Sequence, residues 1–199
     1  MNNEKDMMVN EAVPVYNRKY TYKDYLKWDD DIRCELIDGY PYMMSAPTIR
    51  HQRISRKLLV QLDTFLQGKT CEVFHAPFDV RLYAGVSDLA DDAVDTVVQP
   101  DLVVICDDTR LDKTGCKGAP DMAIEILSPS STDKDKMIKY WKYLKAGVRE
   151  YWIVDPDNNR LMVHLLDEDY QVIHTYSSEE RAPVNILPGC TIDLQDVFL

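Results

Sequence analysis

The sequence has few cysteines, and their positions form no pairing pattern. Only five occur among the 199 residues, and no two have the C-x-x-C spacing that is common in zinc and redox motifs. An odd number of cysteines, in a chain whose N-terminus does not resemble a secretion signal, argues against a disulfide framework. We therefore expect a reduced, cytoplasmic protein without a zinc site.

Long apolar runs and an excess of positive charge are missing as well. No apolar run approaches the ~18 residues that a membrane-spanning helix needs, so no membrane association is expected. Asp and Glu outnumber Lys and Arg by 34 to 23, which gives a net charge of −11. A field of this sign repels phosphate groups. A nucleic-acid-binding function would therefore need local basic patches or metal ions.

The composition fits a chain that folds around one core. A length of 199 residues with 45% apolar content is ordinary for a single globular domain. Residues 1–18 are polar and have no clear period, so we expect a mobile N-terminal arm there. The prediction is a single domain over residues 19–199.

Local sequence signals predict the helices, the hairpin turn and the loop in the first half of this domain. Thr21 and Asp24 have the spacing of a capping box that opens a short helix. Asp38-Gly39 predicts the tight turn of a β-hairpin. Apolar residues at helical spacing then run from Ile54 to Leu66, and this helix should end at Gly68. The aspartate-rich stretch 85–96 is predicted to be a loop.

The second half alternates strand-like and helical patterns. Residues 132–146 predict a helix with Met137, Trp141 and Leu144 on its apolar face. Strand-like runs lie on both sides of it, at 102–105, 122–127, 151–154, 161–166 and 172–176. The order of elements predicts an α/β fold in which a mixed β-sheet is flanked by helices and ends in a C-terminal β-meander.

Two carboxylates stand within runs that should be buried. Asp101 begins the run Leu102–Ile105, and Glu125 lies inside the run 122–127. A strand period of two puts Glu125 on one face with Ala123 and Leu127. An ionised carboxylate is costly to bury without a cation or hydrogen bonds. If the two runs are neighbouring strands, both acids reach one point, where Mg²⁺ or Mn²⁺ would find oxygen ligands.

Five motifs in the same order resemble one family. They are ELIDG (35–39), RHQ (50–52), QPDLV (99–103), EILSPS (125–130) and GVREYWIVDP (147–156). With them the chain resembles the Uma-two family of endonucleases, a branch of the PD-(D/E)XK nuclease superfamily, from about residue 20 to the C-terminus. The resemblance implies a restriction-endonuclease-like core, Mg²⁺ or Mn²⁺ as cofactor, and hydrolysis of DNA phosphodiester bonds.

The same resemblance assigns roles to individual residues. It places the metal carboxylates on Glu35, Asp101 and Glu125. The superfamily pattern has a lysine two residues after the last acid, where this chain has Leu127. The Uma-two pattern instead has its lysine on the following helix, which corresponds to Lys139. The aspartate-rich stretch 85–96 departs from the family and would hinder the approach of a polyanion.

For each further candidate residue, both a functional and a purely structural interpretation are open. His51 would bind a phosphate or lie near the metal, or it is an ordinary helical histidine. Gln99 would orient water or a ligand, or it is an edge-strand amide. Arg50, Arg53 and Arg56 would form a phosphate track on one helix face, although such charges often only solvate a helix.

Two hypotheses about function follow. In the first, the protein is a metal-dependent DNA endonuclease, and a homodimer because two-fold symmetry suits the cutting of both strands. In the second, it is a catalytically idle relative whose acidic surface serves protein association. The intact set of acids favours the first hypothesis, and the charge of −11 favours the second.

Overall fold

A six-stranded mixed sheet forms the centre of the structure. The computed structural model describes residues 18–29, 32–83, 90–128, 133–166 and 172–199. The strand order of the sheet is β11-β10-β9-β8-β6-β3. Its strands are β3 (Glu72–His75), β6 (Leu102–Ile105), β8 (Met122–Ile126), β9 (Glu150–Asp155), β10 (Arg160–Leu165) and β11 (Val172–Ser177). Strands β8 and β9 are parallel, and β9, β10 and β11 form the predicted antiparallel meander. The predicted α/β fold with a mixed sheet is confirmed.

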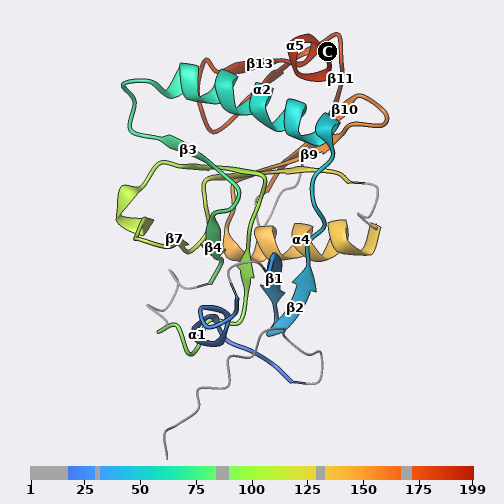
Figure 1. The fold of residues 1–199 in the computed structure, drawn as a ribbon. Helices are drawn as coiled ribbons and strands as arrows, with labels where there is room; N and C mark the ends of the chain where they lie inside the picture. Colours follow the sequence, from blue (N-terminus) through green and yellow to red (C-terminus); the bar gives the residue numbers. More distant parts are fainter. Residues whose placement is uncertain (1–17, 30–31, 84–89, 129–132, 167–171) are drawn as a thin grey trace, which may run out of the picture.

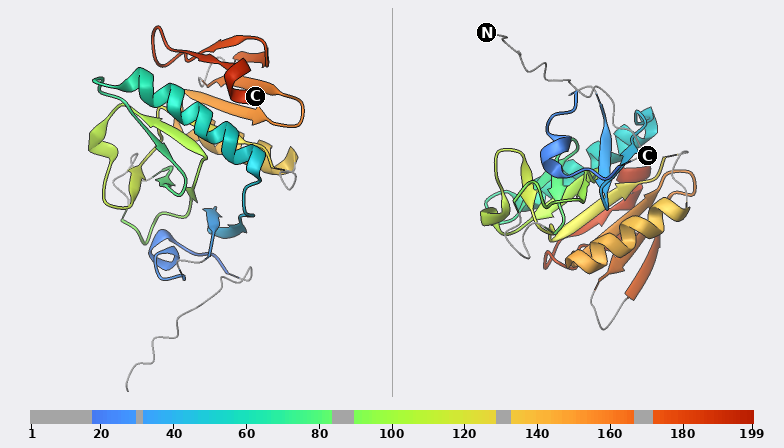
Figure 2. Two further views of the ribbon diagram at one scale, coloured as in Figure 1. Left: turned by 45° about the horizontal axis from the view of Figure 1, so that its top comes forward. Right: turned by 90° about the horizontal axis from the view of Figure 1, so that it is seen from below.

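Two helices cover opposite faces of this sheet. Figure 1 shows α2 (Ile49–Leu66) above the strands and α4 (Asp133–Ala146) below them, and the right view of Figure 2 shows α4 lying across the sheet. Side chains alternate between the two cores, as a strand period of two requires. In β6, Leu102 and Val104 pack with α2, whereas Val103 and Ile105 pack on the α4 side. The face on which a strand residue lies therefore decides which helix it meets.

A second sheet of five strands packs on the α4 side. Its order is β2-β1-β5-β4-β7, with β1 (Cys34–Ile37), β2 (Tyr40–Met43), β4 (Asp79–Arg81), β5 (Val97–Val98) and β7 (Gly115–Lys117). The predicted hairpin is confirmed, because Asp38 and Gly39 turn between β1 and β2 with φ angles of 53° and 83°. Val80 and Val98 pack in one cluster with Val103 of the central sheet, so the two sheets share a core.

Smaller elements complete the fold. The short helix α1 (Tyr22–Tyr25) begins at the predicted capping box of Thr21 and Asp24. The remaining elements are η1 (Asp108–Arg110), β12 (Arg181–Pro183), β13 (Thr191–Asp193) and α5 (Leu194–Phe198). Residues 90–96 form a loop, as predicted, and 84–89 lie outside the described residues. Nearly all of the predicted N-terminal arm, residues 1–18, also lies outside them.

The predicted apolar face of α4 is wrong at Met137 and Trp141, whereas Leu144 packs against the core as predicted. Met137 and Trp141 are 53% and 54% exposed, whereas Tyr140 and Tyr143 are buried. The side of the helix that packs on the core carries Ile138 and Leu144 together with Tyr140 and Tyr143. Hydropathy alone ranks tyrosine below methionine and tryptophan, but its ring can be buried where its hydroxyl finds a partner, as that of Tyr143 does at Glu125.

The expected absence of disulfides is also wrong. Cys71 and Cys106 form a disulfide across the end of the β3–β6 pair. The antiparallel register pairs Glu72 with Ile105, so the two cysteines face each other one step further along. The remaining cysteines, Cys34, Cys116 and Cys190, are free and buried. In the part of the chain that the structure describes, no helix is long and apolar enough to cross a bilayer.

Candidate metal and nuclease site

A cavity of about 600 Å³ lies where the start of α2, the β1–β2 hairpin and the ends of β6 and β8 meet. Its walls include residues from both sheets and from both flanking helices. Among the lining residues are five that the sequence singled out: Glu35, His51, Asp101, Glu125 and Lys139. These residues are spread over more than 100 positions of the chain, and the fold brings them to one place.

Two of the acids face each other across neighbouring strands. The register of β6 and β8 pairs Leu102 with Ile124, so Asp101 stands opposite Glu125 one step further along. Glu125 lies on the α4 side of β8, on the face that strand periodicity predicted. The backbone N–H of Ile126 donates to Asp101 Oδ2 over 2.7 Å, which fixes the orientation of that carboxylate.

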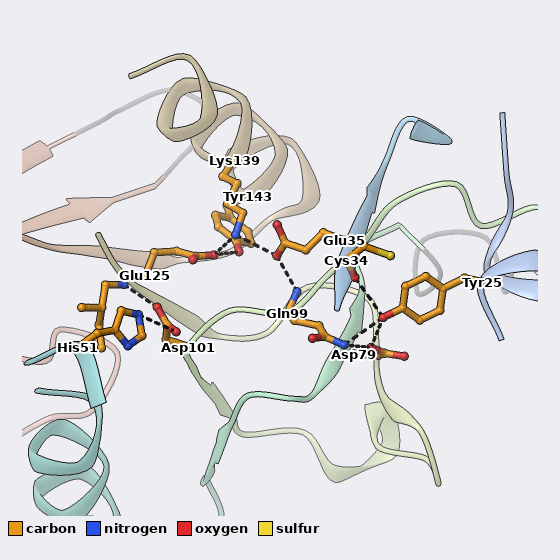
Figure 3. Close-up of polar contacts among 11 residues, drawn as sticks. Tyr25, Cys34, Glu35, His51, Asp79, Gln99, Asp101, Glu125, Lys139 and Tyr143 are labelled. Atoms are coloured by element: carbon orange, nitrogen blue, oxygen red, sulfur yellow. Dashed lines mark hydrogen bonds and ion pairs between the residues drawn. The ribbon is translucent and has the colours of Figure 1, made fainter. Parts of the chain in front are cut away.

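Lys139 reaches from α4 to two acids at once (Figure 3). Its Nζ lies 2.8 Å from Glu125 Oε1 and 2.9 Å from Glu35 Oε1. All three side chains are largely buried, with exposed fractions of 16% for Lys139, 14% for Glu125 and 5% for Glu35. The helix thus supplies an ammonium group to two of the acids, whereas the residue directly after β8 is Leu127.

Burial and neighbouring charges shift the pKa values of two groups in this pocket, Glu125 and Lys139. Burial raises the pKa of Glu125; Lys139 opposes this rise, and the carboxylates of Glu35 and Asp101 add to it. Burial alone would lower the pKa of Lys139, but Glu125 and Glu35 outweigh burial and raise it, so its ammonium stays protonated. The cavity is lined by three carboxyl groups, those of Glu35, Asp101 and Glu125, and by two cationic side chains, those of Lys139 and Arg33. Because Glu35 and Asp101 help to raise the pKa of Glu125, a cation that approached all three would be attracted.

His51 is held beside Asp101. Its backbone N–H donates to Thr48 Oγ1, the N-cap of α2, and its Nε2 lies 3.2 Å from Asp101 Oδ1. Burial opposes a charge on the imidazole, but Asp101 and Glu125 outweigh it and raise the pKa of His51. Its buried Nδ1 has no hydrogen-bond partner among the described residues. The imidazole is thus placed to change its proton count next to an acid of the pocket.

Gln99 holds an acid through its backbone rather than its side chain. The backbone N–H of Gln99 donates to Glu35 Oε1 over 2.8 Å. Its side-chain amide points away from the acids and donates to Tyr25 Oη and to Asp79 Oδ1 (Figure 3). This arrangement does not suit the predicted role of a side chain that orients water. The residue instead fixes the position of Glu35.

The three predicted arginines do not form one track. Arg50 donates from Nε to the carbonyl oxygen of Pro156 over 3.1 Å, which ties it to the turn after β9. Arg53 and Arg56 line a shallow hollow next to the main cavity, and neither forms an ion pair with another described residue. The hollow and the cavity share four lining residues, namely Pro47, Gln52, Ser55 and His75. Arg53 and Arg56 therefore line a hollow that adjoins the cavity, whereas Arg50 is bonded to the turn after β9.

Sequence reasoning missed one residue that contacts the site. The hydroxyl of Tyr143 donates to Glu125 Oε1 over 2.7 Å, and its side chain is fully buried. Burial raises the pKa of Tyr143, so it remains a hydrogen-bond donor. The signal that could have revealed it is its spacing: Tyr143 follows Lys139 by four positions, which places both side chains on one helix face.

The carboxylates that line the cavity are the type of ligand that binds a hard divalent cation. Among the described residues, no group of three Asp, Glu, His or Cys side chains stands close enough to hold a metal ion. Lys139 occupies the space between Glu35 and Glu125, which separates these two carboxylates. Carboxylate oxygens are nevertheless the ligands that Mg²⁺ and Mn²⁺ prefer, and three carboxyl groups line this cavity. Asp101 and Glu125 are the pair that the strands bring face to face.

The chain is similar to known proteins over most of its length. The profile of the Uma2 family, described as "Putative restriction endonuclease", matches residues 22–195. The uncharacterized protein slr1290 of Synechocystis sp. is 27% identical over 169 residues, which cover 82% of this chain and 83% of that protein. A crystal structure from Anabaena variabilis, described as "a putative nuclease belonging to DUF820", matches with a TM-score of 0.69. That match covers 90% of this chain and 97% of the other at 19% identity, which shows a shared fold.

Proposed function

This chain belongs to the Uma2 family, and on that basis we propose that it is a divalent-metal-dependent endonuclease that hydrolyses DNA phosphodiester bonds. The observation that supports this proposal most strongly is the pocket in which Glu35, Asp101 and Glu125 meet one ammonium, Lys139. Hydrolysis of a phosphodiester needs an activated water, neutralised charge at phosphorus and stabilisation of the leaving oxygen. We assign these tasks to a bound ion and to the side chains that line this pocket.

Each residue has its own part in the proposed mechanism. Asp101 and Glu125 would hold Mg²⁺ or Mn²⁺, with Glu35 as a further oxygen donor. The ion, when bound, supplies charge neutralisation and lowers the pKa of a coordinated water. Lys139 places a positive charge where the phosphate oxygens gain negative charge in the transition state. His51 orients Asp101 and can accept or release a proton at Nε2.

A metal-dependent rise in thermal stability is the first expected result. An ion that binds the folded protein alone stabilises it by mass action, by about 2.7 kcal/mol at ~100 times its dissociation constant. Mn²⁺ and Mg²⁺ should therefore raise the melting temperature, as measured by differential scanning fluorimetry with Ca²⁺ and EDTA as comparisons. A melting temperature that is the same in saturating Mn²⁺ and in EDTA would contradict the proposal.

The substrate would approach over α2. Arg53 and Arg56 line the hollow that adjoins the cavity, and Arg33 lines the cavity itself, so these cations are placed to contact phosphates on either side of the cut. Local cations matter in this chain because its net charge of −11 repels DNA as a whole. A homodimer would place two such sites on a duplex, and the mass of the protein in solution tests that part of the proposal.

Replacing Arg53 and Arg56 together by Gln is expected to weaken DNA binding and reduce its salt dependence. Each lost phosphate contact removes about 0.9 from the slope of log K against log [salt], so the double variant should lose about 1.8. Fluorescence anisotropy with a catalytically inactive Glu125→Gln background measures both quantities. Arg50→Gln is the matched control, because Arg50 bonds to the turn after β9. If the control and the double variant lost the same DNA affinity and salt dependence, Arg53 and Arg56 would not form the DNA-binding surface.

The second function class has one observation in its favour. Lys139 already pairs with Glu35 and Glu125, so part of the acid set is satisfied without a metal. A catalytically idle protein that acts in protein association would keep such an internal ion pair. It would show neither a Mn²⁺-dependent melting temperature nor cleavage, which is how the two functions are distinguished.

A further inference from the structure

Tyr143 and Lys139 meet on a single oxygen atom of Glu125. Tyr143 lies one turn after Lys139 on α4, and its side chain is fully buried. Its hydroxyl donates to Glu125 Oε1 over 2.7 Å, and Lys139 Nζ donates to the same oxygen over 2.8 Å. Figure 3 shows both side chains descending from one helix to the carboxylate. One oxygen of Glu125 is thus held by two donors.

The other oxygen of Glu125 is left for a ligand. Among the described residues, no group donates a hydrogen bond to Oε2, although this carboxylate lines the cavity. Two hydrogen bonds to one oxygen also fix the plane of the carboxylate. Glu125 is therefore oriented before any cation arrives, and ligands that are held in this way bind metal more tightly.

Packing alone does not explain the hydroxyl of Tyr143. Its ring contacts the ring of Tyr151 with a centroid distance of 4.8 Å, and phenylalanine would make the same contact. A buried hydroxyl costs free energy unless it is hydrogen-bonded. The partner that offsets this cost is Glu125, so the hydroxyl and the acid belong to one arrangement.

Building on the proposed function, we propose that Tyr143 is a positioning residue of the metal site. By holding Oε1 together with Lys139, it presents Oε2 of Glu125 to the divalent ion as a single-oxygen ligand. Tyr143 acts through Glu125 and does not itself contact the ion. Its contribution should therefore be found in metal affinity.

Titration calorimetry of the full chain with Mn²⁺ tests this role. Tyr143→Phe removes one hydroxyl and keeps the ring, and it is expected to weaken Mn²⁺ binding by roughly 10-fold or more, the range known for partners that hold metal ligands. Tyr140→Phe is the matched control, because Tyr140 is a buried tyrosine of the same helix whose ring contacts Trp141 and His164. The control should bind Mn²⁺ within about twofold of the wild type, which is well below the range expected for such partners.

The possible results of this experiment distinguish the role of Tyr143 from the proposed function. If Tyr143→Phe melts lower, or no longer melts cooperatively, yet no selective loss of Mn²⁺ affinity is measured, the hydroxyl is a structural contact and the inference is overturned. Equal losses in Tyr143→Phe and Tyr140→Phe would overturn it as well. Wild-type protein that binds no Mn²⁺ would instead refute the proposed function. Wild-type binding together with unchanged affinity in Tyr143→Phe refutes the role of Tyr143 alone.

Discussion

Asp101→Asn is expected to abolish both Mn²⁺-dependent stabilisation and DNA cleavage. The substitution keeps the shape of the side chain, and an amide oxygen can still accept the hydrogen bond from Ile126 N that Asp101 Oδ2 accepts over 2.7 Å. It removes one of the two carboxylates that the strands place face to face. A neutral amide binds a divalent cation far more weakly than a carboxylate does. The rate should fall by roughly 10³-fold or more, since charge neutralisation is lost in the transition state.

Asp121→Asn is a control with a closely similar local structure. Asp121 Oδ2 accepts the backbone N–H of Cys106 over 2.7 Å, and its other oxygen pairs with Arg149. This carboxylate lies at the opposite end of the β6–β8 pair and does not line the cavity. Cleavage rate and metal-dependent melting temperature should be close to wild type. Equal losses in the two variants would show that Asp101 matters for folding and not for metal.

Lys139→Met should have two separable effects. The cleavage rate is expected to fall by roughly 10²-fold or more, because an ammonium that stabilises transition-state charge is lost. In the absence of metal, the variant should also be less stable by on the order of 3 kcal/mol, because two buried acids lose their cation. Mn²⁺ should then stabilise this variant more than the wild type, because the loss of a competing positive charge outweighs the loss of the hydrogen bond from Lys139 to Glu125 Oε1.

Lys142→Met separates this role from a general effect of charge on α4. Lys142 pairs with Asp38 in the hairpin turn and lies outside the acid cluster. Kinetics at saturating Mn²⁺ and melting curves with and without metal measure both effects. A wild-type rate in Lys139→Met, or equal losses in the Lys142→Met variant, would remove the proposed role of Lys139.

The sequence predicts those parts of the site that depend on the order of apolar and charged residues within one strand. A strand period of two predicts the face of β8 on which Glu125 lies. Asp101 is predicted beside it because one acid begins an apolar run and the other lies inside one. The family resemblance, rather than spacing, singled out Lys139, since nothing local distinguishes it from other lysines of the helix.

The parts that sequence missed depend on contacts between distant residues. The inward face of α4 was assigned from hydropathy, which placed Trp141 inside and gave no reason to turn Tyr143 toward Glu125. The amide of Gln99 turns away from the acids because Asp79 and Tyr25, far away in the sequence, accept its hydrogen bonds. The Cys71–Cys106 disulfide follows from the register of β3 and β6, and no local pattern records that register.

Cleavage of supercoiled plasmid DNA in the presence of Mn²⁺ tests the central claim most directly. Purified wild-type protein should convert supercoiled plasmid to nicked and linear forms with Mn²⁺ or Mg²⁺ and should leave it intact in EDTA. Glu125→Gln, prepared in parallel, should leave it intact under both conditions, which excludes a contaminating nuclease. Intact plasmid with the folded wild type and Mn²⁺, or equal cleavage by wild type and Glu125→Gln, would contradict the assignment of this pocket as a metal-dependent nuclease site.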